Sequence, residues 1–108
     1  MSLRVYIEPK AEADLRAACQ WAAQSAPETA SRWLSRFEEA LQSLSTFPER
    51  CGIAPESDAV GLEIRQLLFG KPPHKWRALF IIENAEVHVL HIHRGSMGTA
   101  AADDLKEQ

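Results

Sequence analysis

The sequence has few cysteines, a single tyrosine and no long apolar run. Its 108 residues include two cysteines, Cys19 and Cys51, which form no CxxC pair. We therefore expect no disulfide framework and two reduced thiols. No run approaches the roughly 20 apolar residues that a membrane-spanning helix needs, and no charged and apolar leader opens the chain. These absences predict a cytoplasmic protein that does not associate with membranes.

The chain also lacks an excess of basic residues. Twelve Lys and Arg residues stand against fifteen Asp and Glu residues, which gives a formal net charge of −3. Proteins that bind nucleic-acid backbones usually carry a clearly basic face. Only residues 65–94 are mildly basic, with five Lys or Arg against two Glu, together with all four histidines. This segment is therefore the place where we look for a functional site.

The second half of the chain predicts three consecutive β-strands. Runs rich in branched and aromatic residues cover 62–69, 76–83 and 86–94, with a Gly- and Pro-containing loop after the first and a two-residue link, Asn84-Ala85, after the second. Such runs and such a link are typical of antiparallel strands. The middle run is apolar on both alternating faces, which indicates a central strand covered on both sides.

The first half predicts one strand and two helices. Residues 3–8 alternate between apolar and polar side chains, as a half-buried strand does. A proline stands at or just before the start of each following stretch, 10–24 and 27–47, and apolar residues recur in both at helical spacing. The short link between them predicts an antiparallel hairpin that covers the sheet. Trp33 and Phe37 are expected in the core.

Two segments are expected to be irregular. Residues 48–61 form a long connection, of the kind that is usually functional or mobile. Residues 96–108 contain few bulky side chains and are expected to form a flexible tail beyond a single domain at 1–95. The predicted fold class is α+β, with an N-terminal strand, a helical hairpin, and a three-stranded antiparallel meander that completes one sheet.

Several short motifs recur in an order and spacing that a known family shares. They are Ala13-Asp14-Leu15, Leu44 with Phe47-Pro48 and Gly52, Ile64-Arg65-Gln66-Leu67, Trp76-Arg77-Ala78-Leu79-Phe80 and Val89-Leu90-His91-Ile92-His93-Arg94. Between residues 5 and 94 the chain thereby resembles the RelE/ParE superfamily of toxins from bacterial type II toxin–antitoxin systems, often called plasmid stabilisation proteins. The resemblance implies a growth-arresting toxin that a cognate antitoxin protein neutralises. We expect no cofactor.

The resemblance leaves the target of the toxin open. RelE-like members cleave mRNA on the ribosome, whereas ParE-like members inhibit DNA gyrase. Cleavage of RNA needs cations that clamp the phosphate and a group that transfers a proton. Arg77 and Arg94 match arginines of the family and could clamp a phosphate, and His91 or His93 could move the proton. These four residues are the catalytic candidates if the protein is RelE-like.

Two departures from the RelE-like pattern favour the ParE-like alternative. RelE-like nucleases carry a tyrosine after the last strand, but the only tyrosine here is Tyr6, and their paired lysines on the first sheet strand are missing. Together with the negative net charge, these departures favour DNA gyrase as the target and protein recognition, not catalysis, as the mode of action. A degenerate, non-toxic member of the family is the third alternative.

Partner binding is expected at Trp21, Arg65 and Arg94. Trp21 lies off the apolar stripe of its helix, and an exposed tryptophan beside small residues can mark a protein contact. For Arg65 and Arg77 a structural alternative stays open, namely ion pairs across the strands. The acidic residues available for such pairs are Glu63, Glu83 and Glu86.

The spacing of His91 and His93 raises the question of a metal site. Two imidazoles on one face of a strand are a spacing that metal sites use. No cysteine or carboxylate of evident matching geometry stands nearby in the sequence. We therefore predict no metal site.

Overall fold

The computed structural model describes residues 2–70 and 75–94. The predicted tail at 96–108 and most of the loop after the first meander strand lie outside these residues. The elements are β1 (Arg4–Ile7), α1 (Pro9–Ser25), α2 (Pro27–Gln42), 3-10 turns at Ser43–Ser45 and Pro48–Arg50, α3 (Glu56–Val60), β2 (Arg65–Phe69), β3 (Trp76–Glu83) and β4 (Glu86–Arg94). The α+β fold class is confirmed.

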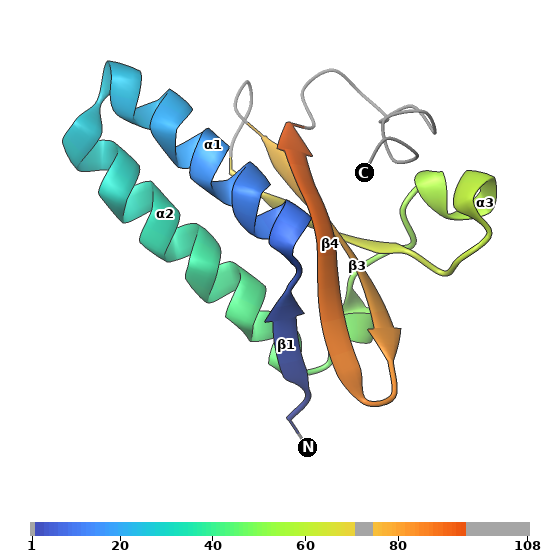
Figure 1. The fold of residues 1–108 in the computed structure, drawn as a ribbon. Helices are drawn as coiled ribbons and strands as arrows, with labels where there is room; N and C mark the ends of the chain where they lie inside the picture. The colour runs from blue at the N-terminus through green and yellow to red at the C-terminus, as the bar shows by residue number, and fades with distance from the viewer. Residues whose placement is uncertain (1, 71–74, 95–108) are drawn as a thin grey trace.

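The strands form one sheet in the order β1-β4-β3-β2 (Figure 1). The pairs β2–β3 and β3–β4 are antiparallel, as the meander predicted. Strand β1 joins the other edge of β4 in the parallel direction, with Arg4 opposite Glu86 and Ile7 opposite Val89. The N-terminal strand therefore pairs with the last strand of the described chain.

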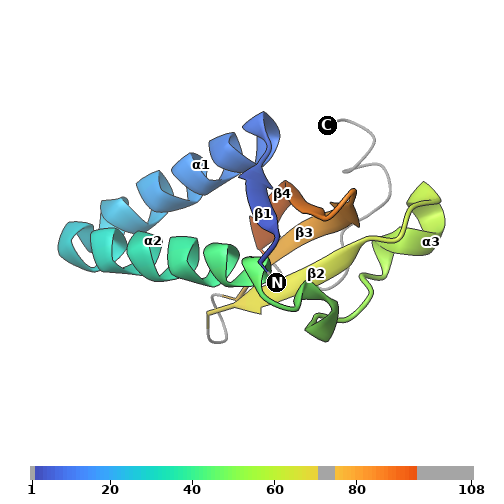
Figure 2. The ribbon, with the colours of Figure 1, turned by 90° about the horizontal axis from the view of Figure 1, so that it is seen from below.

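The two sides of the sheet are covered by different elements. Helices α1 and α2 pack on one side, called the helix face, and α3 lies over the other, called the α3 face (Figure 2). The main core lies on the helix face and contains Ala11, Leu15, Ala18, Phe37, Leu41, Leu44, Cys51, Trp76, Ala78, Phe80, Val87, Val89 and Ile92. A second, smaller cluster on the α3 face contains Ala54, Ile64 and Leu79.

Aromatic rings join the helices to the sheet. Phe37 is fully buried and stacks on Phe69 at 4.5 Å between ring centroids, which confirms its predicted place in the core. Trp33 contacts Phe37 and Trp76 edge-on, at 5.4 and 5.7 Å, but is only partly buried. Trp33 therefore lies at the border of the core.

The second helix ends earlier than predicted. It stops at Gln42, a 3-10 turn follows, and Phe47 adopts a left-handed backbone conformation with φ of 49°. The ring of a following proline disfavours helical backbone in the residue before it, and Phe47 precedes Pro48. As a result, the Phe47 side chain is 66% exposed instead of continuing the apolar stripe.

Strand β4 contains a β-bulge. Leu79 of β3 lies opposite His91, but the next residue, Phe80, lies opposite Val89, so that Leu90 is an extra residue in β4. The bulge reverses the alternation of side chains along the strand. Ile92 therefore joins the core of the helix face, while the neighbouring histidines lie on the other side.

The predicted strand at 62–69 begins three residues later, at Arg65. The predicted irregular segment at 48–61 contains a 3-10 turn and α3.

Within the described ranges, no helix combines the length and the apolar character that crossing a membrane would require.

Candidate functional site

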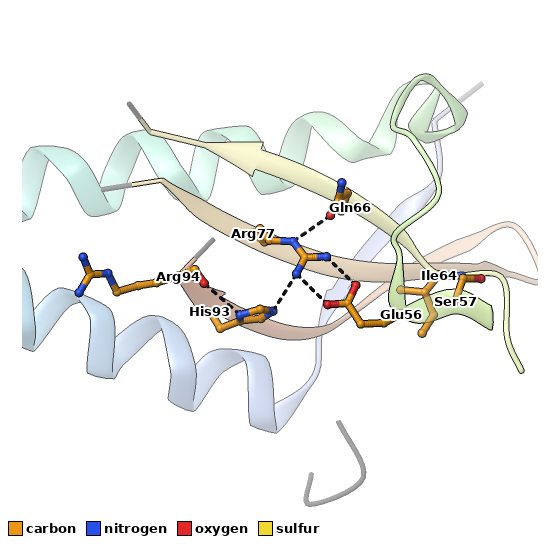
Figure 3. A network of polar contacts seen from close by, with 7 residues as sticks. All are labelled: Glu56, Ser57, Ile64, Gln66, Arg77, His93 and Arg94. Atoms are coloured by element: carbon orange, nitrogen blue, oxygen red, sulfur yellow. Dashed lines mark hydrogen bonds and ion pairs between the residues drawn. The ribbon is translucent and has the colours of Figure 1, made fainter. Parts of the chain in front are cut away.

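Arg77 is the centre of a buried polar network on the α3 face. Its Nη1 and Nη2 donate to the two carboxylate oxygens of Glu56 at 2.7 and 2.5 Å, and its Nε donates to Gln66 Oε1 at 2.8 Å (Figure 3). The side chains of Arg77 and Glu56 are only 6% and 1% exposed. The guanidinium group is thus directed at internal partners.

Glu56 reaches Arg77 because a short connection holds α3 against the sheet. Ser57 Oγ donates to the Leu62 carbonyl and accepts a hydrogen bond from the Ile64 backbone N–H at 3.1 Å. The Ala54 N–H donates to the Ile64 carbonyl at 2.7 Å. Gly61 ends the helix with φ of 80°, a conformation that glycine adopts at little cost. Hydrogen bonds, more than apolar burial, therefore position α3.

His93 completes the network on β4. Its Nε2 lies 3.5 Å from Arg77 Nη1, and its Nδ1 lies 3.2 Å from the Arg94 carbonyl oxygen. Burial lowers the pKa of His93 below its ordinary value, and the neighbouring His91 and Arg77 lower it further. We infer a neutral ring in which Nδ1 donates to the Arg94 carbonyl and Nε2 faces the guanidinium.

His91 belongs to the α3 face by its register with Leu79, but its ring reaches Asp14 of α1 around the edge of β4. Its Nδ1 lies 2.7 Å from Asp14 Oδ2 without the geometry of a hydrogen bond. The same carboxylate accepts a hydrogen bond from the Ile92 backbone N–H at 3.0 Å. It also forms an ion pair with Lys10, whose Nζ lies 2.7 Å from Asp14 Oδ1. Strand β1 ends at Ile7, so no strand of the described chain pairs with this edge of β4 at Ile92. The Ile92 N–H bonds to the Asp14 carboxylate instead.

The four residues proposed for RNA cleavage do not form one cluster. Arg77 and His93 lie together, and the His91 ring stacks on His93 at 4.8 Å. The Arg94 side chain points away from them, with its guanidinium 4.9 Å from the Trp21 ring centroid (Figure 3). Within residues 2–70 and 75–94, no group of three or more His, Cys, Asp or Glu side chains could hold a metal ion.

Trp21 and Arg94 belong to a second candidate site, at the border between the helical hairpin and the sheet. Trp21 is 41% exposed and contacts Trp76 edge-on at 6.3 Å. A hollow of about 230 Å³ lies between Trp21, Trp33, Trp76 and small residues of the two helices, and a second of about 310 Å³ extends past Trp21 to Arg94. We call Trp21, Trp33, Trp76 and Arg94 the tryptophan notch.

Arg65 is engaged within the protein. Its Nη1 donates to the carbonyl oxygens of Glu49 and Cys51 at 3.2 and 2.7 Å, and its Nη2 lies 3.8 Å from Glu63. The side chain is 18% exposed. Glu63 was among the acidic residues considered for Arg65, but it precedes Arg65 on the same segment, so this pair does not cross the strands as the structural alternative expected. Arg77 pairs with Glu56, which was not among the residues considered.

A third histidine, His88, lies near the other end of β4. Its Nδ1 is 2.8 Å from Glu8 Oε1, its Nε2 is 3.2 Å from Glu86 Oε1, and Tyr6 stacks on the ring at 5.3 Å. The hydrogen bond with Glu8 raises the pKa of His88 above its ordinary value, and Glu86 adds to the effect. The His88 imidazole thus links the residue that follows β1 to β4, and protonation of the ring strengthens this link.

Glu56, Gln66 and Asp14 are the polar partners that sequence reasoning missed. Glu56 lies 21 residues before Arg77 in the chain, in a segment that carried no periodic signal. A carboxylate just after a proline, inside a connection that also contains buried apolar residues, is the only local hint. The pairing itself depends on tertiary structure.

Comparison with known proteins places the chain in a family. A family model described as "ParE toxin of type II toxin-antitoxin system, parDE" matches residues 5–98. The chain belongs to the ParE toxin family. The predicted resemblance to ParE-like members of the superfamily is therefore confirmed. The chain belongs to a toxin family of type II toxin–antitoxin systems.

A solved structure agrees with this assignment at the level of the fold. The ParE-family chain is similar to a chain of the "Chromosomal ParDE TA system from P. aeruginosa", with a TM-score of 0.68 and 23% sequence identity over 86% of this chain and 96% of that one. At this identity the likeness bears on the fold alone. No curated protein matches the sequence.

Proposed function

We propose that this ParE-family toxin arrests growth by inhibiting DNA gyrase and that a cognate antitoxin neutralises it by direct binding. The observation that carries the proposal is the state of Arg77, whose guanidinium is buried and bonded to Glu56 and Gln66. A ribonuclease would need that group for the phosphate. Arg94, the other expected clamp, lies apart beside Trp21. This geometry favours protein recognition over RNA cleavage.

The tryptophan notch supports binding of a protein partner. Exposed tryptophan and arginine side chains are the residues that most often dominate the energy of protein interfaces. Here Trp21 and Arg94 stand beside hollows that a partner's apolar side chains could fill. We place the antitoxin at this notch. Arg65 donates to backbone carbonyls inside the protein and is 18% exposed, so the proposed contact depends on Trp21 and Arg94.

The target is tested by inducing the toxin without its antitoxin and following DNA and protein synthesis in the first minutes. We expect DNA synthesis to fail first, and purified gyrase to lose supercoiling activity when the toxin is added. An early failure of protein synthesis with unaffected gyrase would contradict the proposal and favour the mRNA endonuclease. No effect of the induced, folded protein on either process would indicate a non-toxic member.

The antitoxin site is tested with the protein encoded beside the toxin gene. We expect Trp21→Ala to weaken antitoxin binding at least tenfold and Arg94→Ala to weaken it less, since interface tryptophans cost about 2 kcal/mol or more on truncation. Phe47→Ala, which removes an exposed aromatic residue outside the notch, is the matched control. Equal affinities for all three variants by calorimetry would place the antitoxin elsewhere.

A further inference from the structure

Two arginines of α2 face solvent one helical turn apart without an acidic partner. Arg32 and Arg36 are both exposed, and among the residues that the structure describes neither forms an ion pair or a hydrogen bond. Glu28, one turn before Arg32, does not pair with it either. By contrast, Arg16 of α1 pairs with Glu12 at 2.8 Å. The guanidinium groups of α2 are therefore available to acidic groups of another molecule.

The two arginines border a hollow that also has aromatic walls. Strand β2 runs toward α2 (Figure 2), and a hollow of about 500 Å³ between them is lined by Arg32, Trp33, Arg36 and Phe69. Trp33 and Phe69 are half-buried and contact each other edge-on at 6.1 Å. Aromatic and arginine side chains are enriched in protein interfaces. The hollow therefore suits a segment that carries both apolar and acidic side chains.

The outer edge of β2 is open beside this hollow. The Gln66 N–H points away from β3 and donates to the Gly52 carbonyl at 3.0 Å. Backbone groups of an antiparallel strand alternate in direction, so the N–H and C=O of Leu68 point the same way. Within residues 2–70 and 75–94, no strand continues the sheet beyond β2. An extended segment can therefore add main-chain hydrogen bonds at Leu68, whose side chain is 47% exposed.

The hollow continues the surface of the tryptophan notch. Thr29 and Trp33 line both this hollow and the hollow of about 230 Å³ beside Trp21. A partner chain that fills the notch can extend past Trp33 to the two arginines of α2. The contact surface for a protein is therefore continuous from the notch to the end of β2.

The spacing of the two arginines sets the spacing of the acidic groups that fit them. Residues four apart in a helix are separated by about 6 Å along its axis, and alternate residues of an extended chain by about 7 Å. Carboxylates at alternate positions of a strand can thus meet Arg32 and Arg36 in turn. A guanidinium group binds a carboxylate through two parallel hydrogen bonds. The side chains between the carboxylates then face the Leu68 side of the sheet.

We propose that Arg32, Trp33, Arg36, Phe69 and the open edge at Leu68, called the β2 groove, bind an extended acidic segment of a partner protein. The segment carries carboxylates at alternate positions and apolar side chains between them. This inference rests neither on gyrase as the target nor on the antitoxin at the notch, and its test uses neither protein.

The first test titrates the isotope-labelled full chain with a blocked peptide of sequence Glu-Leu-Glu-Leu-Glu and follows its nuclear magnetic resonance spectrum. The peptide should shift the side-chain N–H resonances of Arg32 and Arg36 and the backbone amide resonance of Leu68. The uncharged peptide Gln-Leu-Gln-Leu-Gln should bind about tenfold more weakly. Absence of shifts at these three residues, or equal affinity for the two peptides, would overturn the proposal.

Charge reversal locates the site. Arg32→Glu and Arg36→Glu should each weaken binding of the acidic peptide about fivefold, because each removes an attraction and adds a repulsion. Arg16→Glu makes the same charge change at an exposed arginine of α1 outside the groove. This matched control should keep the wild-type affinity within about twofold, since salt screens distant charges. Equal weakening in all three folded variants would contradict a site at the groove.

A single-stranded oligonucleotide tests the alternative of a nucleic-acid site. It supplies negative charges but no peptide groups for the edge of β2, so it should bind more weakly than the acidic peptide. Stronger shifts of the Arg32 and Arg36 resonances with the oligonucleotide would overturn the proposal. The antitoxin site at the notch is tested separately by Trp21→Ala, so failure of one proposal is distinguishable from failure of the other.

Discussion

The two faces of the sheet are closed by different physical means. On the helix face, apolar and aromatic side chains such as Phe37 and Phe80 are removed from water entirely. On the α3 face, the ion pair of Arg77 with Glu56 and the hydrogen bonds of Ser57 hold a short helix in place. The packing of the helix face is thus stabilised by buried apolar area. The position of α3 depends on each partner of its ion pair and hydrogen bonds being present.

This difference predicts different responses to mutation. Apolar stabilisation grows with the area buried, so each truncation on the helix face should cost in proportion to the volume lost. A buried ion pair adds little net stability, but removal of one partner leaves a buried charge without compensation. Loss of one partner on the α3 face should therefore be severe, and loss of both should be mild.

The largest effect is expected on the helix face. Phe37→Ala should lower the free energy of unfolding by about 3–5 kcal/mol, as emptying a fully buried aromatic site does. Trp33→Ala should cost clearly less, because Trp33 is only partly buried. Urea denaturation of both variants checks the order. A greater loss for Trp33→Ala would contradict the burial argument.

The next effect concerns the ion pair. Glu56→Ala should lower the free energy of unfolding by about 3 kcal/mol, because the buried guanidinium loses its counterion. The double replacement Glu56→Leu with Arg77→Met should recover most of this loss. A double-mutant cycle measures the coupling. Additive losses would mean that the two charges are independent, against the network described for this face.

A smaller effect is expected for the hydroxyl that holds α3. Ser57→Ala leaves the Leu62 carbonyl and the Ile64 N–H without this partner. The expected loss is about 1–3 kcal/mol. Hydrogen exchange at Ile64 should accelerate in the variant more than exchange in α2. Uniform acceleration in both would show that α3 does not open independently of the helical hairpin.

Two histidines of β4 should respond to pH in opposite directions. The folded pKa of His88 lies above its ordinary 6.5, so its contribution to stability is present below 6.5 and is lost as the pH rises through the folded value. The folded pKa of His93 lies below 6.5, so its contribution is present above 6.5 and is lost as the pH falls toward the folded value.

The measurement compares each variant with the wild type at about pH 5.5 and about pH 8, where histidines dominate the titration. The stability lost in His88→Gln should be larger at the lower pH. The stability lost in His93→Gln should be larger at the higher pH. The same direction for both variants would show that one of the two environments is wrongly described.

The smallest effect on stability is expected at the notch. Arg94→Ala removes a guanidinium that lies over an exposed tryptophan, a contact worth about 0.5–1 kcal/mol at such sites. The melting temperature should change by only a few degrees. A large drop in melting temperature would mean that Arg94 supports the fold. Weaker antitoxin binding by Arg94→Ala could then not be assigned to a lost interface contact.

Strong local periodicity explains which elements could be predicted. The strands at 76–83 and 86–94 were predicted with their observed ends, because both are rich in β-branched and aromatic residues and are bounded by turn residues. Helix α2 was predicted too long, since Phe47 continues the apolar spacing while its backbone does not continue the helix. Periodicity reports a tendency of side chains, whereas the backbone leaves the α-helix at Gln42 and continues as a 3-10 turn.

The candidate site was harder to predict because its partners meet through tertiary structure. Simple alternation would place His91 and His93 on the same face as Val87 and Val89, and only the bulge at Leu90 reverses this. Glu56 lies in a segment with no repeating pattern. The sequence could therefore identify Arg77 and His93 as candidates, but it could not identify the carboxylate that pairs with Arg77.

The parallel pairing of β1 with β4 determines when the protein can fold during its synthesis. Arg4 emerges from the ribosome well before its partner Glu86. Until then the apolar side chains of β1 and of the helical hairpin have no sheet to cover them. A prematurely terminated chain without β4 should therefore be an exposed, protease-sensitive polypeptide and not a partly active toxin.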